Sequence, residues 1–527
     1  MKNIKYILLS AVLIGFTACN DESDFEDQLD NPLTEEVLPP LTAGSANFSN
    51  YVSIGNSLTA GFTDNALFIQ GQVNSIPNML SQQFASIGGG SFTQPLMDDN
   101  IGGLLFGGMQ NVDGSFGPRL FFDGSGPSGL PAVSTTEAFA PSVGSQNNMG
   151  VPGAASYHLL YDGYGNPGNL LTTPPTANPY YVRMASAPNA TVLGDALAQQ
   201  PTFVSLWIGN NDVLGYATSG GDQTAAAITP IDGPPGVGFD QTIGAIVNSI
   251  QASGAQGVMA NIPYVTTIPH FTTVPHNPVP LDAATAGFLN SASAYGAYNG
   301  GLDATLAFLM ANPAQLAFFF PPNDSMTSEE LATAEIAKRK IYFSEGAGNA
   351  VVIMDENLTD LTAINAALVS MRQATEDDLL VLPASSFIGT EAIPGNPTTV
   401  NGVAIPLADK WVLTPEEQAE IITATDSFNA TLQSAATSAG FAFVDANTLM
   451  QQLDNGGYSD GDFILTSSLV TGGAFSLDGV HPTARGYALL ANEFMKAIDA
   501  TYGSNFEASG SLLDIGNYPT NYPPTLQ

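Results

Sequence analysis

The chain has 527 residues, which is long enough for more than one domain or for one domain with large insertions. Hydrophobic residues make up 44% of it, so a substantial core is expected and disorder of the whole chain is excluded. With 48 acidic and 11 basic residues, the net charge of −37 argues against nucleic-acid binding and against unaided binding to anionic membranes, because both surfaces would repel it.

Residues 1–18 are typical of a secretory signal. Two lysines precede an apolar run from Ile7 to Phe16, and this run is too short to span a bilayer as a mature helix. Cys19 follows, and as the only cysteine it excludes an intrachain disulfide and zinc sites built from several thiolates. The segment 16–19 resembles the lipobox of bacterial lipoproteins, which implies that Cys19 carries a lipid anchor. The alternative is an ordinary signal peptide with an incidental cysteine.

Residues 19–46 are acidic, polar and interrupted by prolines, so we expect a flexible tether. An acidic run directly after the lipidated cysteine resembles surface-exported lipoproteins of Bacteroidota-type bacteria. That resemblance implies the outer membrane of a Gram-negative bacterium, with the protein facing either the surface or the periplasm.

Apolar strands alternate with helices along much of the remaining chain. Strands are predicted at 51–54, 203–208, 257–262 and 441–445, and helices at 77–84, 239–252, 414–439 and 483–498. Residues 85–140 are rich in Gly, Ser and Pro and predict long loops. The alternation favours an α/β fold, a three-layer α/β/α sandwich around a central parallel sheet.

Residues 266–411 interrupt this rhythm and are interpreted as an insertion near the active-site edge. They hold helix-like stretches at 302–311 and 328–340, and a hairpin is expected around 346–349. The insertion is either a lid or a structural elaboration without a gating role. Within it, the apolar segment Leu316–Phe320 could form an acyl-binding surface, although such a segment is more often part of a core.

Three polar segments lie beside these elements. Ser57 follows the first strand on a glycine-flanked turn, where an exposed hydroxyl can act as a nucleophile. Asn211 follows the second predicted strand, where its amide can face an oxyanion. Asp478 stands three residues before His481, so that its carboxylate can orient the imidazole. Taken singly, each could be a simple turn residue.

In this order the three segments resemble those of the SGNH (GDSL-type) hydrolase family, whose remaining block is matched by 148–154 with its glycine placed at Gly153. The resemblance implies a flavodoxin-like core made of 47–265 and 412–500, followed by a C-terminal tail at 501–527. One departure is Asn56, where the family has Asp; the shape is retained and a charge is lost.

The same resemblance implies a mechanism. Ser57 would be the nucleophile, His481 the general base and Asp478 the residue that fixes the imidazole tautomer. The backbone amides of Ser57 and Gly153 and the side chain of Asn211 would form the oxyanion hole. No metal or cofactor is required.

Other chemistry is less well supported by the sequence. There is no G-x-S-x-G motif, which disfavours the α/β-hydrolase fold. His158, His270 and His276 are interpreted as structural or solvent-exposed, and a metal pair of His270 with His276 lacks neighbouring carboxylates.

The leading hypothesis is an extracytoplasmic esterase or lipase that hydrolyses acyl lipids or acylated carbohydrates. The alternative is a noncatalytic surface lipoprotein that binds glycans or lipids on a degenerate hydrolase scaffold. A purely structural surface-layer role is a third hypothesis.

Overall fold

In a computed structural model, which describes residues 37–396 and 398–527, five parallel strands form the central sheet. The strands are β4 (Asn148–Gly150), β1 (Tyr51–Gly55), β5 (Phe203–Trp207), β6 (Gln256–Ala260) and β13 (Ala442–Val444), in that spatial order. Numbered along the chain, the order is 2-1-3-4-5, the order of flavodoxin-like doubly wound sheets. The predicted fold class is therefore confirmed. The predicted signal sequence and Cys19 lie outside the described residues.

The strands are continuous buried runs, as expected for a sheet covered on both faces. Every residue of β1 and β5 is buried. The short strand β4 was not predicted, because Asn148–Gly150 contains neither an apolar run nor a β-branched residue. Its Gly150 is required by close packing, since a Cβ there would lie 2.4 Å from the amide nitrogen of Ala60.

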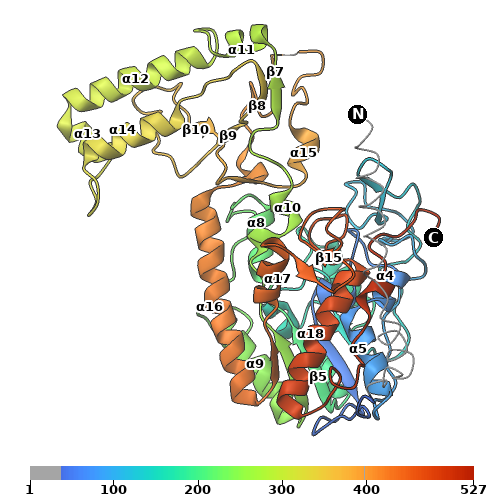
Figure 1. The fold of residues 1–527 in the computed structure, drawn as a ribbon. Helices are drawn as coiled ribbons and strands as arrows, with labels where there is room; N and C mark the ends of the chain where they lie inside the picture. The colour runs from blue at the N-terminus through green and yellow to red at the C-terminus, as the bar shows by residue number, and fades with distance from the viewer. Residues whose placement is uncertain (1–36, 397) are drawn as a thin grey trace, which may run out of the picture.

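Helices cover both faces of the sheet (Figure 1). On one face α5 (Ile76–Ala85) packs against α18 (Ala484–Tyr502), and on the other α9 (Phe239–Ala252) packs against α16 (Pro415–Ala439). The ring centroids of Phe239 and Phe428 lie 4.0 Å apart between α9 and α16. The predicted bounds of these helices hold to within a few residues.

The sequence signals that mark the start and the end of α16 both take their expected form in the structure. Thr414 and Glu417 form a reciprocal capping box around Pro415, and Gly440 ends the helix in a left-handed conformation with φ 69°.

Between β6 and α16 the chain leaves the core and forms an arm that projects from one end of the sheet (Figure 1). The arm is reached through η3 (Val265–Thr267) and α10 (Pro269–Thr272). Its helices are α11 (Ala283–Leu289), α12 (Tyr295–Ala311), α13 (Pro313–Phe319), α14 (Ser328–Arg339) and α15 (Ala384–Phe387). Arg372 is 1% exposed and forms 2.6 Å ion pairs with Asp355 and Asp378, which hold the arm strands together.

The arm strands form antiparallel pairs. They are β7 (Val279–Leu281) with β8 (Gly346–Asn349), β9 (Val352–Met354) with β10 (Met371–Gln373), and β11 (Leu379–Leu380) with β12 (Val412–Leu413). The hairpin expected around 346–349 is therefore wrong, because this segment is itself a strand and pairs with β7, far away in the chain.

Helix α13 contains most of the segment Leu316–Phe320, and it lies at the far end of the arm (Figure 1). Leu316 and Phe320 are buried there, whereas Phe318 is 75% exposed. Among the described residues, no single helix is long and apolar enough to cross a membrane, and α12 and α13 meet those criteria only as a pair bent by 118°.

The remaining elements are short. They are α3 (Ser57–Ala60), α4 (Ile69–Val73), β2 (Leu120–Phe122), β3 (Pro127–Gly129), η1 (Ser156–Leu160), η2 (Pro167–Leu171), α6 (Pro179–Val182), α7 (Val192–Ala198), α8 (Asn211–Thr218), η4 (Asp409–Trp411), α17 (Ala446–Asp454), β14 (Tyr458–Ser459), β15 (Ile464–Leu465) and η5 (Ile515–Asn517). Of residues 501–527, expected as a tail, the first two complete α18 and the others pack on the core. The buried Arg119 donates hydrogen bonds to the carbonyls of Tyr522, Pro523 and Leu526.

Candidate active site

The two strand ends that carry Ser57 and Asn211 are neighbours in the sheet. Ser57 begins α3 directly after β1, and Asn211 begins α8 after β5. Connections leave β1 and β5 in opposite directions, which makes this edge the switch point where open α/β sheets bind ligands. The expected placement of both residues at one edge of the sheet agrees with the structure.

Asn56 fixes the turn that carries Ser57. Its side-chain oxygen caps α3 by accepting a 3.0 Å hydrogen bond from the amide of Leu58, and its amide nitrogen donates to Asn210 at 3.1 Å. An aspartate could accept the first bond but could not donate the second. The residue that departs from the family pattern therefore has both of its polar atoms engaged.

Ser57, His481 and Asp478 form a continuous chain of hydrogen bonds. Nε2 of His481 lies 2.9 Å from Oγ of Ser57, and Nδ1 lies 3.0 Å from Oδ2 of Asp478. Oδ1 of Asp478 accepts bonds of 2.8 Å from the amides of Val480 and His481. Burial raises the pKa of Asp478, but the adjacent imidazole and these hydrogen bonds outweigh burial and lower the pKa to about 2. Asp478 is thus an ionised hydrogen-bond acceptor at neutral pH.

The segment after α3, which was not predicted as part of the site, holds the loop of Asp478 and His481 in place. The amide of Asn65 donates to Asp478 at 2.8 Å, and Oγ1 of Thr63 donates to the carbonyl of Pro482 at 2.9 Å. Asp64 and Asn65 have φ of 50° and 61°. Asp and Asn adopt this left-handed conformation more readily than other non-glycine residues, and that pair was the only signal in the sequence.

Asp64 is a second buried acid beside this loop. The amide of Leu477 donates to its carboxylate at 3.1 Å. Burial raises the pKa of Asp64 to about 7, the bond from Leu477 opposes this effect, and the charge of Asp478 adds to it. Two carboxyl groups on facing loops thus have pKa values shifted in opposite directions.

The proposed oxyanion donors lie on two linked segments. One N–H of the side-chain amide of Asn211 donates to the carbonyl of Ala154 at 2.9 Å. The other N–H of this amide takes no part in that bond. Asp212 accepts bonds of 2.8 and 2.7 Å from the amide and hydroxyl of Ser156. These contacts hold the segment of Gly153 against the start of α8.

The backbone donors differ in placement. Ser57 is the first residue of α3, so its N–H has no acceptor within the helix. Gly153 is exposed with φ 82°, and its N–H makes no hydrogen bond to any described residue. However, Gly153 does not line the cavity beside Ser57, whereas Asn211 does.

A narrow cavity of about 90 Å³ opens beside Ser57 and His481. One end is polar, with Asn210 and Asn211. The rest is apolar and is lined by side chains of α8, α17, α18, the loop after β6 and the loop before His481, among them Leu214, Ile268, Leu449, Phe475 and Leu489. A polar end next to a nucleophile and an apolar interior suit a carbonyl group followed by a hydrocarbon chain.

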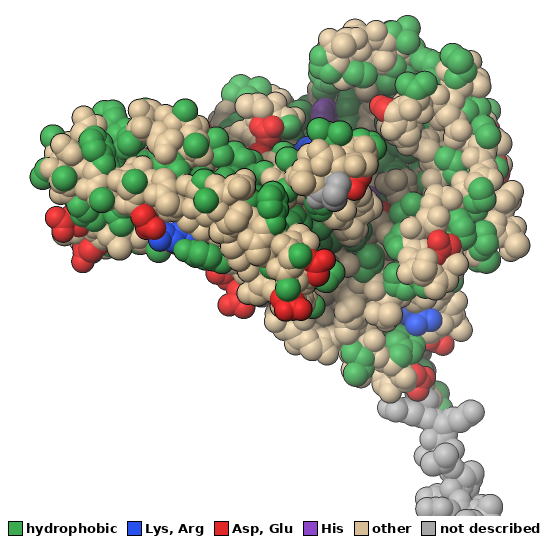
Figure 2. Space-filling view, turned by 90° about the horizontal axis from the view of Figure 1, so that it is seen from above, with side chains coloured by type: hydrophobic (Ala, Val, Ile, Leu, Met, Phe, Trp, Pro, Cys, Tyr) green, Lys and Arg blue, Asp and Glu red, His purple; other side chains and the backbone are tan. Residues whose placement is uncertain are grey.

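A wider cleft of about 810 Å³ reaches the same imidazole from the other side. Core residues such as Asn65 and Asp478 form one wall, and arm residues including Ser385 and Ile388 form the other. Seen from above, the surface is hollowed between the arm and the loops of the core (Figure 2). His481 lies between a narrow apolar space and a broad open one.

The other histidines have structural surroundings. Nδ1 of His158 accepts a 3.0 Å bond from the amide of Ala155, and the ring stacks on Tyr164. Burial lowers the pKa of His158 and of His270 to about 4 each. The amide of His270 donates to the carbonyl of Gly479 at 2.9 Å and so supports the loop between Asp478 and His481. Among the described residues, neither His270 nor His276 belongs to a cluster of three or more metal-ligating groups.

Residues 334–494 match the family model described as GDSL-like Lipase/Acylhydrolase. The matched stretch contains Asp478 and His481, but not Ser57, Gly153 or Asn211, and it begins in α14 of the arm. Comparisons with curated proteins and with solved structures found no match. The match supports the resemblance to the SGNH (GDSL-type) hydrolases and supports hydrolase activity in general.

Proposed function

We propose that the protein is a serine esterase that cleaves carboxylic esters through an acyl-enzyme. The observation that carries this proposal is the hydrogen-bond chain from Oγ of Ser57 through His481 to Asp478. A nucleophile, a base and an orienting carboxylate within hydrogen-bond reach are the parts that acyl transfer needs.

The protonation states follow from the geometry. Because Asp478 is ionised it can only accept, so Nδ1 of His481 carries the proton and Nε2 is free to take one from Ser57. Oγ of Ser57 attacks the ester carbonyl while Nε2 takes the hydroxyl proton. The resulting imidazolium is stabilised by Asp478.

The carbonyl oxygen becomes negatively charged in this step. The backbone N–H of Ser57, the amide of Asn211 and the backbone N–H of Gly153 are the proposed donors to it. His481 then gives its proton to the leaving alcohol, and the acyl group stays on Ser57. Water, deprotonated by the same imidazole, releases the carboxylic acid and restores Ser57.

The narrow cavity and the broad cleft suit different parts of an ester substrate. The apolar cavity beside Ser57 favours a hydrocarbon acyl chain, and the broad cleft under the arm favours a bulky alcohol part. Acyl lipids and acylated carbohydrates both have this form. The segment Leu316–Phe320 is not proposed as the acyl site, since it does not line the cavity and lies at the tip of the arm (Figure 1).

Hydrolysis of p-nitrophenyl esters by wild type and Ser57→Ala tests the proposal, with Ser434→Ala, an exposed serine on α16 outside both spaces, as a matched control. Ser57→Ala should lose at least about 10³-fold in kcat, and Ser434→Ala should stay near wild type. A fluorophosphonate should label Ser57 stoichiometrically. Equal turnover by Ser57→Ala and wild type, or no labelling, would favour the noncatalytic lipoprotein instead. A series of acyl chain lengths should show a rate maximum set by the narrow cavity.

The location is a further part of the proposal. Acylation of Cys19 would tether the enzyme to the outer membrane, which the net charge of −37 would otherwise repel. Incorporation of labelled palmitate in cells, and its loss in Cys19→Ala, checks this. If wild type incorporated no palmitate, the protein would be an ordinary secreted protein without a lipid anchor.

A further inference from the structure

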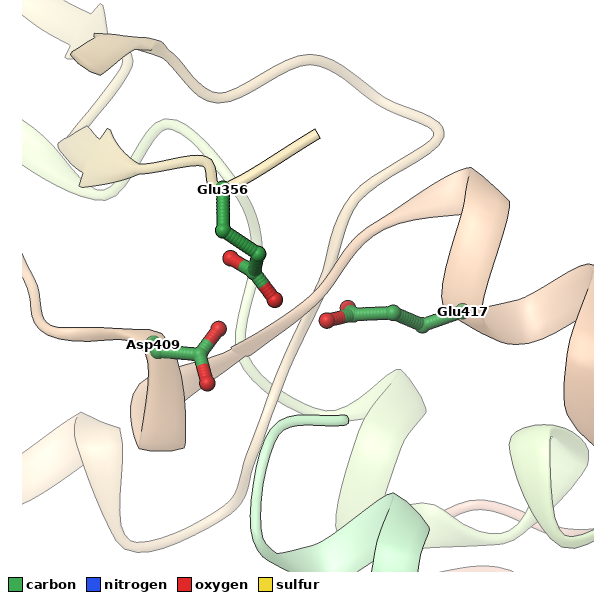
Figure 3. A group of neighbouring side chains, drawn as sticks. All are labelled: Glu356, Asp409 and Glu417. Atoms are coloured by element: carbon green, nitrogen blue, oxygen red, sulfur yellow. The ribbon is translucent and has the colours of Figure 1, made fainter. Parts of the chain in front are cut away.

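Three carboxylates face one another where the arm joins the core, far along the chain from the groups used in ester hydrolysis. Glu356 follows β9, Asp409 begins η4, and Glu417 lies in the first turn of α16 (Figure 3). One oxygen from each lies within 4.8 Å of the others. All three carboxylates point toward a common centre (Figure 3).

No basic side chain in the described part of the protein pairs with these carboxylates. None of the three carboxylates forms a salt bridge to a described residue. The nearby Lys338 is directed to Asp355 and Glu416, at 3.5 and 3.7 Å, and Lys410 lies over the ring of Trp411.

Two carboxylate oxygens inside the cluster are buried and have no hydrogen-bond partner. They are Oε1 of Glu417 and Oδ1 of Asp409. Glu417 is only 4% exposed, and its other oxygen is already used by the capping box, where it accepts from Thr414. A buried acceptor without a donor is costly, so a further positive partner is expected at this point.

A loop of the core closes the cluster on one side. A Cβ on Gly221 would lie 2.1 Å from Oε1 of Glu417, and one on Gly220 would lie 2.2 Å from the carbonyl oxygen of Asp409. Both glycines have positive φ, 74° at Gly220 and 82° at Gly221. Their lack of side chains lets the backbone after α8 approach both acids, while the exposed Glu356 leaves an entrance from solvent.

We propose that Glu356, Asp409 and Glu417 bind a divalent cation of the oxygen-preferring kind, Ca²⁺ above all, which fastens the arm to the core. The donors are all oxygens, without histidine or thiolate, as hard cations require. Two oxygens bound to one Ca²⁺ lie at most about 5.2 Å apart, and the three oxygens of the cluster, all within 4.8 Å of one another, lie inside this limit.

The cation would join Glu356 to Asp409 and Glu417, which lie more than fifty positions further along the chain. Two ligands come from the arm, the third from α16, and the glycine loop that touches them ends α8, the helix that begins at Asn211. The proposed role is structural, and it does not depend on esterase activity.

The test is cation binding by the full-length protein after treatment with a chelator. Calorimetry with CaCl₂, and luminescence of Tb³⁺ sensitised by Trp411 two residues after Asp409, should both report a site that Ca²⁺ and Tb³⁺ share. Saturating Ca²⁺ should raise the Tm by about 2–5 °C. Glu356→Gln, Asp409→Asn and Glu417→Gln should each weaken Ca²⁺ binding about tenfold or more. Glu416→Gln, the exposed neighbour in the same helical turn, should bind as wild type.

A second measurement separates a cation site from a proton-sharing cluster. In chelator, Glu417→Gln should be at least as stable as wild type, because Gln keeps the acceptor for Thr414 and cannot repel Glu356 or Asp409. Ca²⁺ should then no longer raise its Tm. No binding of Ca²⁺ or Tb³⁺ by wild type at millimolar concentration would overturn the proposal, and so would unchanged binding by all three variants.

Discussion

The loop of Asp478 and the seam around Glu417 each hold buried carboxylates, but in opposite surroundings. At Asp478, backbone amides and an imidazole surround the carboxylate and lower its pKa to about 2. At Glu417, the carboxylate faces other carboxylates, and burial and Glu356 raise its pKa to about 9 against the hydrogen bonds from Thr414. Burial alone therefore does not decide the state of an acid here. The number of hydrogen-bond donors decides it, because both oxygens of Asp478 have donors whereas only one oxygen of Glu417 does.

The strongest test of this comparison removes the negative charge of Asp478. Asp478→Asn keeps the shape but allows the wrong imidazole tautomer, so kcat should fall about 10³–10⁴-fold while the protein stays folded. Steady-state kinetics with circular dichroism check this, and the exposed Asp460→Asn is the control. A loss of less than tenfold would contradict the role given to Asp478.

The oxyanion donor should give the next largest effect. Asn211→Ala should lower kcat about 10²–10³-fold with little change in KM, because the bond strengthens only in the transition state. Asn248→Ala, an exposed asparagine on α9, should leave kcat unchanged. A change confined to KM would show that Asn211 binds substrate and does not stabilise the oxyanion.

The segment after α3 offers a smaller effect on the same loop. Thr63→Val removes the bond to the carbonyl of Pro482 and keeps the volume, so kcat should fall several-fold through loosened placement of His481. Thr63→Ser should restore most of the rate. If both variants equal wild type, the segment only packs and does not position the imidazole.

The smallest effect concerns Asp64, which has one amide donor and the charge of Asp478 nearby. Its raised folded pKa means that the folded state binds the extra proton, so stability is present at low pH and falls as the pH rises from about 4 through about 7. Asp64→Asn should abolish that part of the fall. Its stability relative to wild type should therefore be greater at pH 8 than at pH 5. Tm measured at the two pH values checks this, and parallel curves for both proteins would refute it.

The positions of the proposed reactive residues were predictable because strand ends obey simple rules. An apolar run that stops at a glycine turn predicted where Ser57 and Asn211 lie, and the spacing of Asp478 to His481 predicted their pairing. The resemblance added Gly153, which the structure leaves outside the cavity beside Ser57.

The carboxylate cluster and the strand pairing of the arm could not be predicted, because they depend on contacts between residues remote in sequence. The capping role of Glu417 was visible in the local pattern, but its second oxygen meets Glu356 and Asp409 only after the arm has folded. Likewise, β8 pairs with β7 across more than sixty intervening positions, which no local periodicity encodes.

The separation of Ser57 and His481 by 424 positions has a consequence for the nascent chain. Until the last helix has emerged and docked, Ser57 is an ordinary alcohol with no base beside it. A chain cut anywhere before His481 would lack the base that the proposed mechanism needs, however well its first strands had formed. Under the proposed function, the protein therefore cannot attack acyl groups while it is being made, and its reactivity begins only with the completed fold.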